Sequence, residues 1–228
     1  MSENFWKLVS VVIFDFDGTI ADTLEPLLAI ANQLADEFGY PPITLEYLKQ
    51  LQLLDTRDII RQSKIPILKI PFLLRRLRSE LNQRISTVQP IQGVPEALAQ
   101  LKQQGHTIGI VTSNSEENVL AFLQHQGLLD LFDFVKSGTT IFGKHRVINR
   151  LLKKQNIDVS QAIYVGDETR DIESAKAINM RIISVSWGFH DYSVLARYNP
   201  TQLIESPHLL IDSVQKLSCQ FGMPEWHG

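Results

Sequence analysis

Apolar residues recur along the chain in short continuous runs that are separated by longer amphipathic stretches. The first run, residues 8–14, is rich in β-branched residues, as expected for a strand buried on both faces of a parallel sheet. Further runs of this kind lie at 107–111, 162–165 and 181–185, with a weaker one at 132–135. Amphipathic patterns that predict helices lie between them at 94–104, 116–126 and 146–155. This alternation of strands and helices predicts an α/β fold with a doubly wound, Rossmann-like parallel sheet.

Residues 22–88 interrupt the alternation. A strong amphipathic pattern at 24–38 ends at Gly39, and further helical patterns lie at 45–53, 55–63 and 67–85. No strand pattern occurs among them. We therefore expect an all-helical cap domain of residues 22–88, inserted into an α/β core domain of residues 1–21 and 89–228.

The composition narrows the class of protein. The 228 residues suffice for one α/β domain with a smaller insert. A net charge of −3 argues against a general nucleic-acid binder, and no apolar run approaches the ~20 residues of a membrane span. The single cysteine excludes an internal disulfide, and no basic leader precedes the first apolar run. We expect a cytoplasmic protein that binds neither nucleic acid nor membrane.

Carboxylates gather where two of the predicted strands end. Asp15 and Asp17 follow the first strand, and Asp167 and Asp171 follow the strand at 162–165. Ligands bind at this edge of an open α/β sheet. Alternate residues on an extended backbone point the same way, so Asp15 and Asp17 can face one ligand. Four carboxylates would repel one another, and Mg²⁺, which prefers oxygen ligands, would relieve that repulsion.

Groups that can bind phosphate lie near these acids. Thr112, Ser113 and Asn114 follow the strand at 107–111, and Lys144 lies in the loop FGKHR. The Thr112 hydroxyl, the Asn114 amide and the lysine can all bond phosphate oxygens, which favours phosphoryl transfer. Ser113 and Asn114 are equally suited to turn or capping chemistry.

The predicted cap has a basic segment. Residues 57–84 contain eight Lys/Arg and two Asp/Glu, which would attract an anionic phosphate. Arg57 and Arg61 share one helix face and are candidates for contacting the substrate. Arg75, Arg76 and Arg78 are expected on a solvated face.

These motifs resemble those of the haloacid dehalogenase-like hydrolase superfamily. DFDGT, which contains Asp15 and Asp17, resembles the first motif, and GDETRD, with Asp167 and Asp171, resembles the fourth. Thr112 and Lys144 match the second and third. The layout is similar to phosphoglycolate phosphatases and β-phosphoglucomutase-like enzymes with a helical cap.

The resemblance implies a role for each motif. Asp15 is the nucleophile that forms an aspartyl-phosphate, and Asp17 is the general acid and base. Mg²⁺ is held by Asp15, the Asp17 backbone carbonyl and Asp167, with Asp171 nearby or through water. Thr112 and Lys144 hold the phosphoryl oxygens.

Two departures from the family pattern bear on these assignments. His145 stands where relatives often have proline, so Lys136 is an alternative to Lys144. Asn179 stands where many relatives have glycine, and asparagine tolerates left-handed backbone.

The implied activity is hydrolysis of a small phosphorylated metabolite, such as phosphoglycolate. The alternatives are a phosphomutase, in which a sugar hydroxyl replaces water, and a noncatalytic regulatory protein on the same fold. Retention of both Asp15 and Asp17 argues against the noncatalytic alternative. The oligomeric state is not readable from the sequence.

Overall fold

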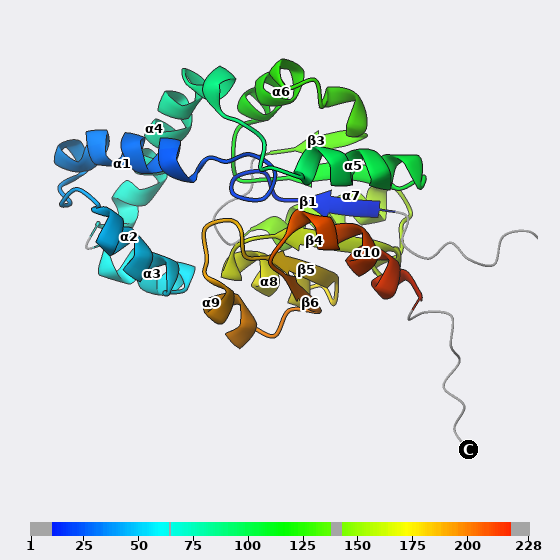
Figure 1. Ribbon diagram of the computed structural model, residues 1–228. Helices are drawn as coiled ribbons and strands as arrows, with labels where there is room; N and C mark the ends of the chain where they lie inside the picture. Colours follow the sequence, from blue (N-terminus) through cyan, green and yellow to red (C-terminus); the bar gives the residue numbers. More distant parts are fainter. Residues whose placement is uncertain (1–10, 64, 138–142, 220–228) are drawn as a thin grey trace, which may run out of the picture.

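A six-stranded parallel sheet forms the centre of the molecule (Figure 1). The computed structural model describes residues 11–63, 65–137 and 143–219, so residues 8–10 of the first predicted strand lie outside it. The strands are β1 (Val11–Phe14), β2 (Thr107–Val111), β3 (Phe134–Lys136), β4 (Ala162–Gly166), β5 (Arg181–Val185) and β6 (Gln202–Ile204). Their spatial order is β3-β2-β1-β4-β5-β6, and every pairing is parallel. The predicted α/β fold class is confirmed.

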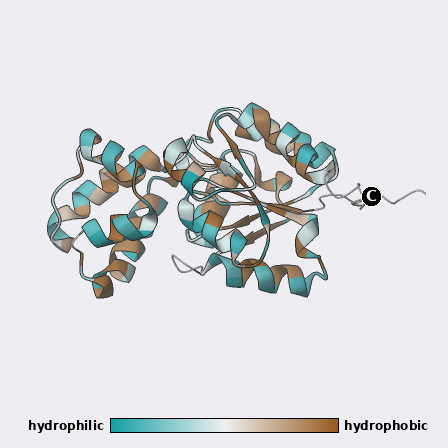
Figure 2. Ribbon diagram, turned by 90° about the horizontal axis from the view of Figure 1, so that it is seen from below, coloured by the Kyte–Doolittle hydropathy of each residue, from teal (hydrophilic) through white to brown (hydrophobic). Residues whose placement is uncertain are grey.

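Helices cover both faces of the sheet because alternate strand residues point to opposite sides. Val12 and Phe14 of β1 join the cluster that includes side chains of α5 (Val94–Gln103), α6 (Glu116–His125) and α10 (Leu210–Cys219). Val11 and Ile13 join the opposite cluster, with α7 (Lys144–Lys154) and α8 (Thr169–Lys176). Figure 2 shows the apolar strands enclosed between helices that turn hydrophilic residues outward.

Four helices between β1 and α5 form a second body beside the sheet (Figure 1). They are α1 (Leu24–Phe38), α2 (Leu45–Gln52), α3 (Thr56–Gln62) and α4 (Ile70–Asn82). The structure places no strand in the described part of 22–88. We call this body the cap; its domain boundaries at 22 and 88 remain a prediction.

The helical pattern predicted at 67–85 is confirmed in its central part, but the α-helix is shorter than the pattern. α4 begins at Ile70, and short 3₁₀ turns at Ile67–Lys69 and Ile85–Thr87 flank it. Pro71 lies in the first turn of α4, where its missing N–H costs no helical hydrogen bond.

Further differences concern short or polar elements. α8, α9 (Tyr192–Arg197), β6 and α10 are absent from the sequence prediction. α7 begins at Lys144, not at residue 146, so this lysine is in the helix and not in a loop. The sequence pattern predicted a later start because the first turn of α7 is polar, and its apolar residues begin to repeat with helical spacing only after that turn.

Within the described residues, no helix has both the length and the apolar character needed to cross a bilayer.

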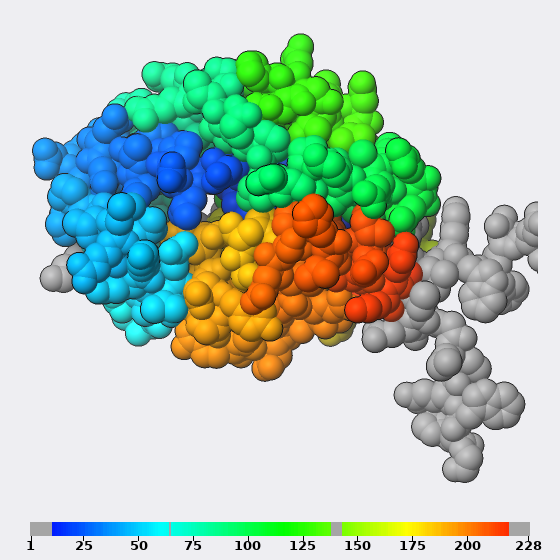
Figure 3. All heavy atoms as spheres, in the orientation of Figure 1, coloured from blue at the N-terminus to red at the C-terminus, as the bar shows by residue number. Residues whose placement is uncertain are grey.

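The loop between α2 and α3 docks the cap on the core. The Tyr198 hydroxyl donates to Asp55 Oδ2 at 2.9 Å, and Arg197 donates to the Leu53 carbonyl at 3.0 Å. The Asp191 backbone N–H donates to the Gln52 carbonyl at 3.1 Å. Figure 3 shows the cyan cap atoms in contact with the gold to light-orange region that contains α9.

Candidate active site

Asp15 lies at the carboxyl end of β1, in the middle of the sheet. Its backbone N–H donates to Val165 O at 2.9 Å, which fixes the residue against β4. The carboxylate is 1% exposed, and its Oδ1 accepts from the Phe16 backbone N–H at 2.8 Å. The central position of β1 therefore holds this acid at the edge where ligands bind.

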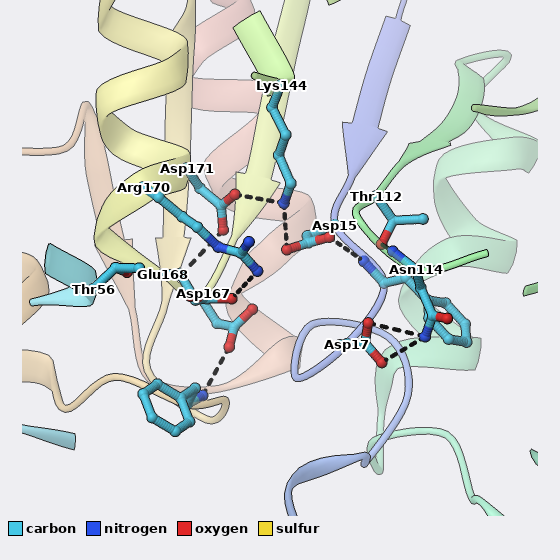
Figure 4. Close-up of polar contacts among 12 residues, drawn as sticks. Asp15, Asp17, Thr56, Thr112, Asn114, Lys144, Asp167, Glu168, Arg170 and Asp171 are labelled. Atoms are coloured by element: carbon cyan, nitrogen blue, oxygen red, sulfur yellow. Dashed lines mark hydrogen bonds and ion pairs between the residues drawn. The ribbon is translucent and has the colours of Figure 1, made fainter. Parts of the chain in front are cut away.

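Lys144 reaches the same point from the first turn of α7. Its Nζ lies 2.5 Å from Asp15 Oδ2 and 2.6 Å from Asp171 Oδ1 (Figure 4). Burial alone would lower the pKa of this fully buried lysine, but the carboxylates of Asp15 and Asp171 outweigh burial and raise the pKa. Lys144 thus stays charged and partly neutralises two acids. Lys136, the alternative, lies exposed on β3.

Asp167 and Asp171 enter from β4 and the start of α8. Asp167 accepts from the Thr19 hydroxyl and from the Phe189 backbone N–H, each at 2.7 Å. Asp171 Oδ2 accepts from the Glu168 N–H at 3.1 Å. Both carboxylates are buried, at 1% and 0% exposure. The hydrogen bonds hold them toward Asp15.

Three carboxylates form a group that fits a divalent cation. Oxygen atoms of Asp15, Asp167 and Asp171 all lie within 4.8 Å of one another. Burial, with the charges of Glu168, Asp15 and Asp171, raises the pKa of Asp167 well above its ordinary value. Burial also raises the pKa of Asp171 to about 6, against the opposing charge of Lys144. This crowding is what an oxygen-liganded cation relieves, so the donor set fits Mg²⁺.

Asp17 faces a different neighbour. Its carboxylate accepts from Asn114 Nδ2 at 3.0 Å on both oxygens, so its side chain lies apart from the group of three carboxylates (Figure 4). Burial raises the pKa of Asp17 to about 6, and the charge of Asp15 adds to the rise. A carboxyl with this pKa can hold and release a proton near neutral pH.

The turn after β2 brings Thr112, Ser113 and Asn114 to the same edge. The Thr112 hydroxyl is buried and accepts from the Asn114 N–H at 3.0 Å, so its own proton is available to an anion. Ser113 is half-buried in this turn. The Asn114 amide holds Asp17.

Two arginines near the site were not predicted from the sequence. The guanidinium of Arg170 pairs with Glu168 and lines the cavity beside the site. Arg78, on α4, is half-buried rather than solvated: burial lowers its pKa, while the nearby charge of Asp17 opposes this. The position of Arg170 inside the motif GDETRD could have identified it as a residue near the site. No such sequence signal exists for Arg78, because its distance from Asp17 depends on how the cap docks.

The structure does not bring Arg57 and Arg61 to the site. Arg57 pairs with Glu173 of α8 at 3.3 Å, and Arg61 pairs with Asp58 at 3.0 Å. Their side chains are 65% and 77% exposed. Neither lines the cavity beside Asp17, so these positions do not support a role in substrate contact.

Comparisons with known proteins agree with this arrangement. A family model described as "Haloacid dehalogenase-like hydrolase" matches residues 12–185. A phosphoglycolate phosphatase of Synechococcus elongatus is 38% identical over 93% of this chain and 100% of its own length. A phosphoglycolate phosphatase of Xylella fastidiosa is 31% identical over 87% of this chain and 90% of its own length.

The fold is also shared with solved structures. A "predicted phosphatase" from Clostridium acetobutylicum superposes with a TM-score of 0.79 at 21% identity, covering 92% of this chain and 99% of the other. At this identity the likeness concerns the fold. Together with the family match over residues 12–185, it confirms the resemblance inferred from the motifs: the chain belongs to the haloacid dehalogenase-like hydrolase family.

Proposed function

We propose that this protein hydrolyses a small phosphomonoester with Mg²⁺, through an aspartyl-phosphate on Asp15. The observation that carries the proposal is the buried Asp15 carboxylate, which has Lys144 at 2.5 Å and belongs to a group of three carboxylates. Asp17, with a pKa near 6, follows two residues later. A nucleophile, a cation, a metal-binding set and an acid–base group are the parts that phosphoryl transfer needs.

The first half of the reaction uses Asp15 and Asp17. An Asp15 oxygen attacks phosphorus, and the bond from phosphorus to the ester oxygen breaks. The leaving alkoxide takes a proton from Asp17, whose raised pKa allows it to be protonated. Thr112 donates to a phosphoryl oxygen, and Lys144 balances the charge on that group.

The second half reverses the role of Asp17. A water molecule attacks phosphorus and gives its proton to Asp17, while the bond from phosphorus to Asp15 breaks. Phosphate leaves and Asp15 is regenerated. Asn114 keeps the Asp17 carboxylate oriented throughout, at 3.0 Å.

Asp15, Asp167 and Asp171 would hold the Mg²⁺, with the Asp17 backbone carbonyl as a further ligand. When bound, the ion supplies positive charge that offsets the negative charge of the phosphoryl group. The spacing of the three carboxylates and the raised pKa values of Asp167 and Asp171 support this assignment.

The first substrate to test is phosphoglycolate, because two relatives are named for that activity. The assay follows phosphate release with Mg²⁺ and with a chelator, for the wild type, Asp15→Asn and Asp36→Asn. Asp36 lies exposed on α1 and is the matched control. We expect loss of activity with chelator and a loss of about 10³-fold or more in Asp15→Asn, as is typical of removing a nucleophile.

Other outcomes would change the proposal. Activity retained by Asp15→Asn would show that another group attacks phosphorus. Conversion of a sugar phosphate to its isomer without phosphate release would establish a phosphomutase instead.

A further inference from the structure

A cavity of about 530 Å³ leads from the catalytic acids into the cap. Asp17, Asp167 and Arg170 line its core end. The rest is lined by the inner faces of all four cap helices. Its volume lies within the range of about 300–1,000 Å³ that is typical of small-molecule sites.

The cap end of the cavity is apolar. α1 contributes Leu27 and Ala31, α2 contributes Leu51, α3 contributes Ile59, and α4 contributes Leu73 and Leu77. Such walls gain free energy by covering carbon atoms of a ligand, and they offer nothing to a charged or hydroxylated group.

Two of the polar groups in the cavity wall are already bonded to the protein, and Tyr47 and Gln62 also line it. The Tyr40 hydroxyl donates to the Ala31 carbonyl at 2.6 Å, and the Ser63 hydroxyl donates to the Ile60 carbonyl at 2.7 Å. Sugar hydroxyls that enter this space would exchange water for a wall that is mostly aliphatic, with few hydrogen-bond partners.

A second anionic group on the substrate would bind in this cavity less favourably than a hydroxyl group. Among the lining residues that the structure describes, Arg170 is the one cation, and its guanidinium is paired with Glu168. A substrate carboxylate extending past Arg170 would meet aliphatic side chains, where an unpaired charge is costly. The cavity is therefore a poor match for the carboxylate of phosphoglycolate.

We propose that the preferred substrates are phosphomonoesters whose leaving group is an apolar alkyl or aryl alcohol, seated in the cap cavity. This inference rests on the proposed phosphatase activity. The phosphate binds beside the Asp15 carboxylate, on the side of Asp17 and Thr112, and the carbon chain extends past Asp17 between α1 and α4. Products are the free alcohol and inorganic phosphate, as in any hydrolysis of a phosphomonoester.

The test compares methyl, butyl and hexyl phosphate with phosphoglycolate, all with Mg²⁺. Burying one methylene gains about 0.8 kcal/mol, which is about fourfold in kcat/KM. We expect kcat/KM to rise by up to about this factor per carbon, and hexyl phosphate to exceed phosphoglycolate.

Two variants on α1 distinguish the effect of filling the cavity from a general effect of placing a phenylalanine on this helix. Ala31→Phe places a ring in the cavity, whereas Ala29→Phe places the same ring on the exposed side of the same helix. Ala31→Phe should lower kcat/KM for hexyl phosphate by about tenfold or more, as for other filled apolar pockets. It should spare methyl phosphate and the inhibition constant of inorganic phosphate. Ala29→Phe should change none of these values.

The outcomes distinguish the two proposals. If kcat/KM does not rise with chain length, or Ala31→Phe impairs all esters equally, the apolar-substrate inference is overturned and the phosphatase activity stands. If none of the esters releases phosphate, the phosphatase proposal itself fails.

Discussion

Three glycines make room for the acids of the site. A Cβ on Gly18 or on Gly188 would overlap Asp167 Oδ2, and a Cβ on Gly166 would lie 2.5 Å from Asp171 Oδ2. Two of these glycines belong to the motifs DFDGT and GDETRD. Their small size is therefore part of how the chain packs carboxylates so closely.

Gly18→Ala should be more damaging than Gly105→Ala. Both glycines have positive φ, at 72° and 83°, so alanine strains the backbone by about 1–2 kcal/mol at either position. Only at Gly18 does the new Cβ meet a carboxylate, while nothing lies within 4 Å at Gly105. Urea unfolding and calorimetric Mg²⁺ titration measure both effects. Equal stability losses with unchanged Mg²⁺ affinity would contradict this account.

Asp17 should make the metal-free protein less stable as the pH rises. Its folded pKa is about 6 and its ordinary value is 3.8, so the folded state holds the proton more tightly. The stability from the neutral form is complete below the ordinary pKa and is lost as the pH rises through about 6. In Asp17→Asn, residue 17 is uncharged at every pH. The free energy of unfolding of this variant, relative to that of the wild type, should therefore rise between pH 4 and pH 6.5. Urea unfolding in chelator at each pH measures this difference. Parallel pH profiles would refute the shift.

At the scale of elements, a chain of asparagines joins the cap to Asp17, the proposed acid–base group. Asn82 of α4 donates to Asn118 Oδ1 at 2.5 Å, and Asn118 of α6 donates to Asn114 Oδ1 at 2.9 Å. Asn114 in turn holds Asp17. Asn118 also donates to the Arg78 carbonyl at 3.0 Å, so α4 and α6 meet at this residue.

Asn118→Ala should lower both stability and kcat. Asn118 is 1% exposed, and its loss leaves buried acceptors without a donor, at a cost of about 1–3 kcal/mol. Asn114 would also hold Asp17 less firmly. Asn82→Ala is the control, because Asn82 is half-buried at the outer end and its loss leaves the bond from Asn118 to Asn114 in place. Equal effects of the two variants on kcat would show that the chain does not orient Asp17.

At the scale of the whole molecule, the cap and the core share one hydrophobic cluster. Ile30, Leu34 and Phe38 of α1 and Leu81 of α4 belong to the same buried group as Phe14 of β1. The docked α2–α3 loop adds polar contacts, such as Tyr198 to Asp55 at 2.9 Å. Among the described residues, the buried side chains of the cap therefore form no hydrophobic cluster separate from the core.

Thermal unfolding should accordingly be a single transition. Calorimetric and van't Hoff enthalpies should agree, and Mg²⁺ should raise the midpoint because the proposed metal site exists only in the folded state. Phe38→Ala should lower the midpoint without splitting the transition, since it removes a ring from the shared cluster at a cost of about 3–5 kcal/mol. Two resolved transitions, with the cap melting first, would show that the cap is independently stable.

The sequence by itself determined the strands buried on both faces and the order of the motifs. The apolar runs at 107–111 and 162–165 are continuous because both sides of each strand are covered. Such runs can be recognised directly in the sequence. The family follows from residues that are close in sequence, such as DFDGT and GDETRD. Asn179 also behaves as expected, with φ at 54°.

Only the tertiary structure determined which residues from distant segments of the chain contact one another. Lys144 rather than Lys136 meets Asp15, because α7 begins early enough to bury its first side chain in the site. Arg78 is half-buried and near enough to Asp17 for their charges to interact, while Arg57 pairs with Glu173, and both depend on how the cap docks. The apolar cavity exists only where four helices meet. Such contacts join residues far apart in the chain, and no local period of hydrophobicity encodes which helix faces will oppose each other.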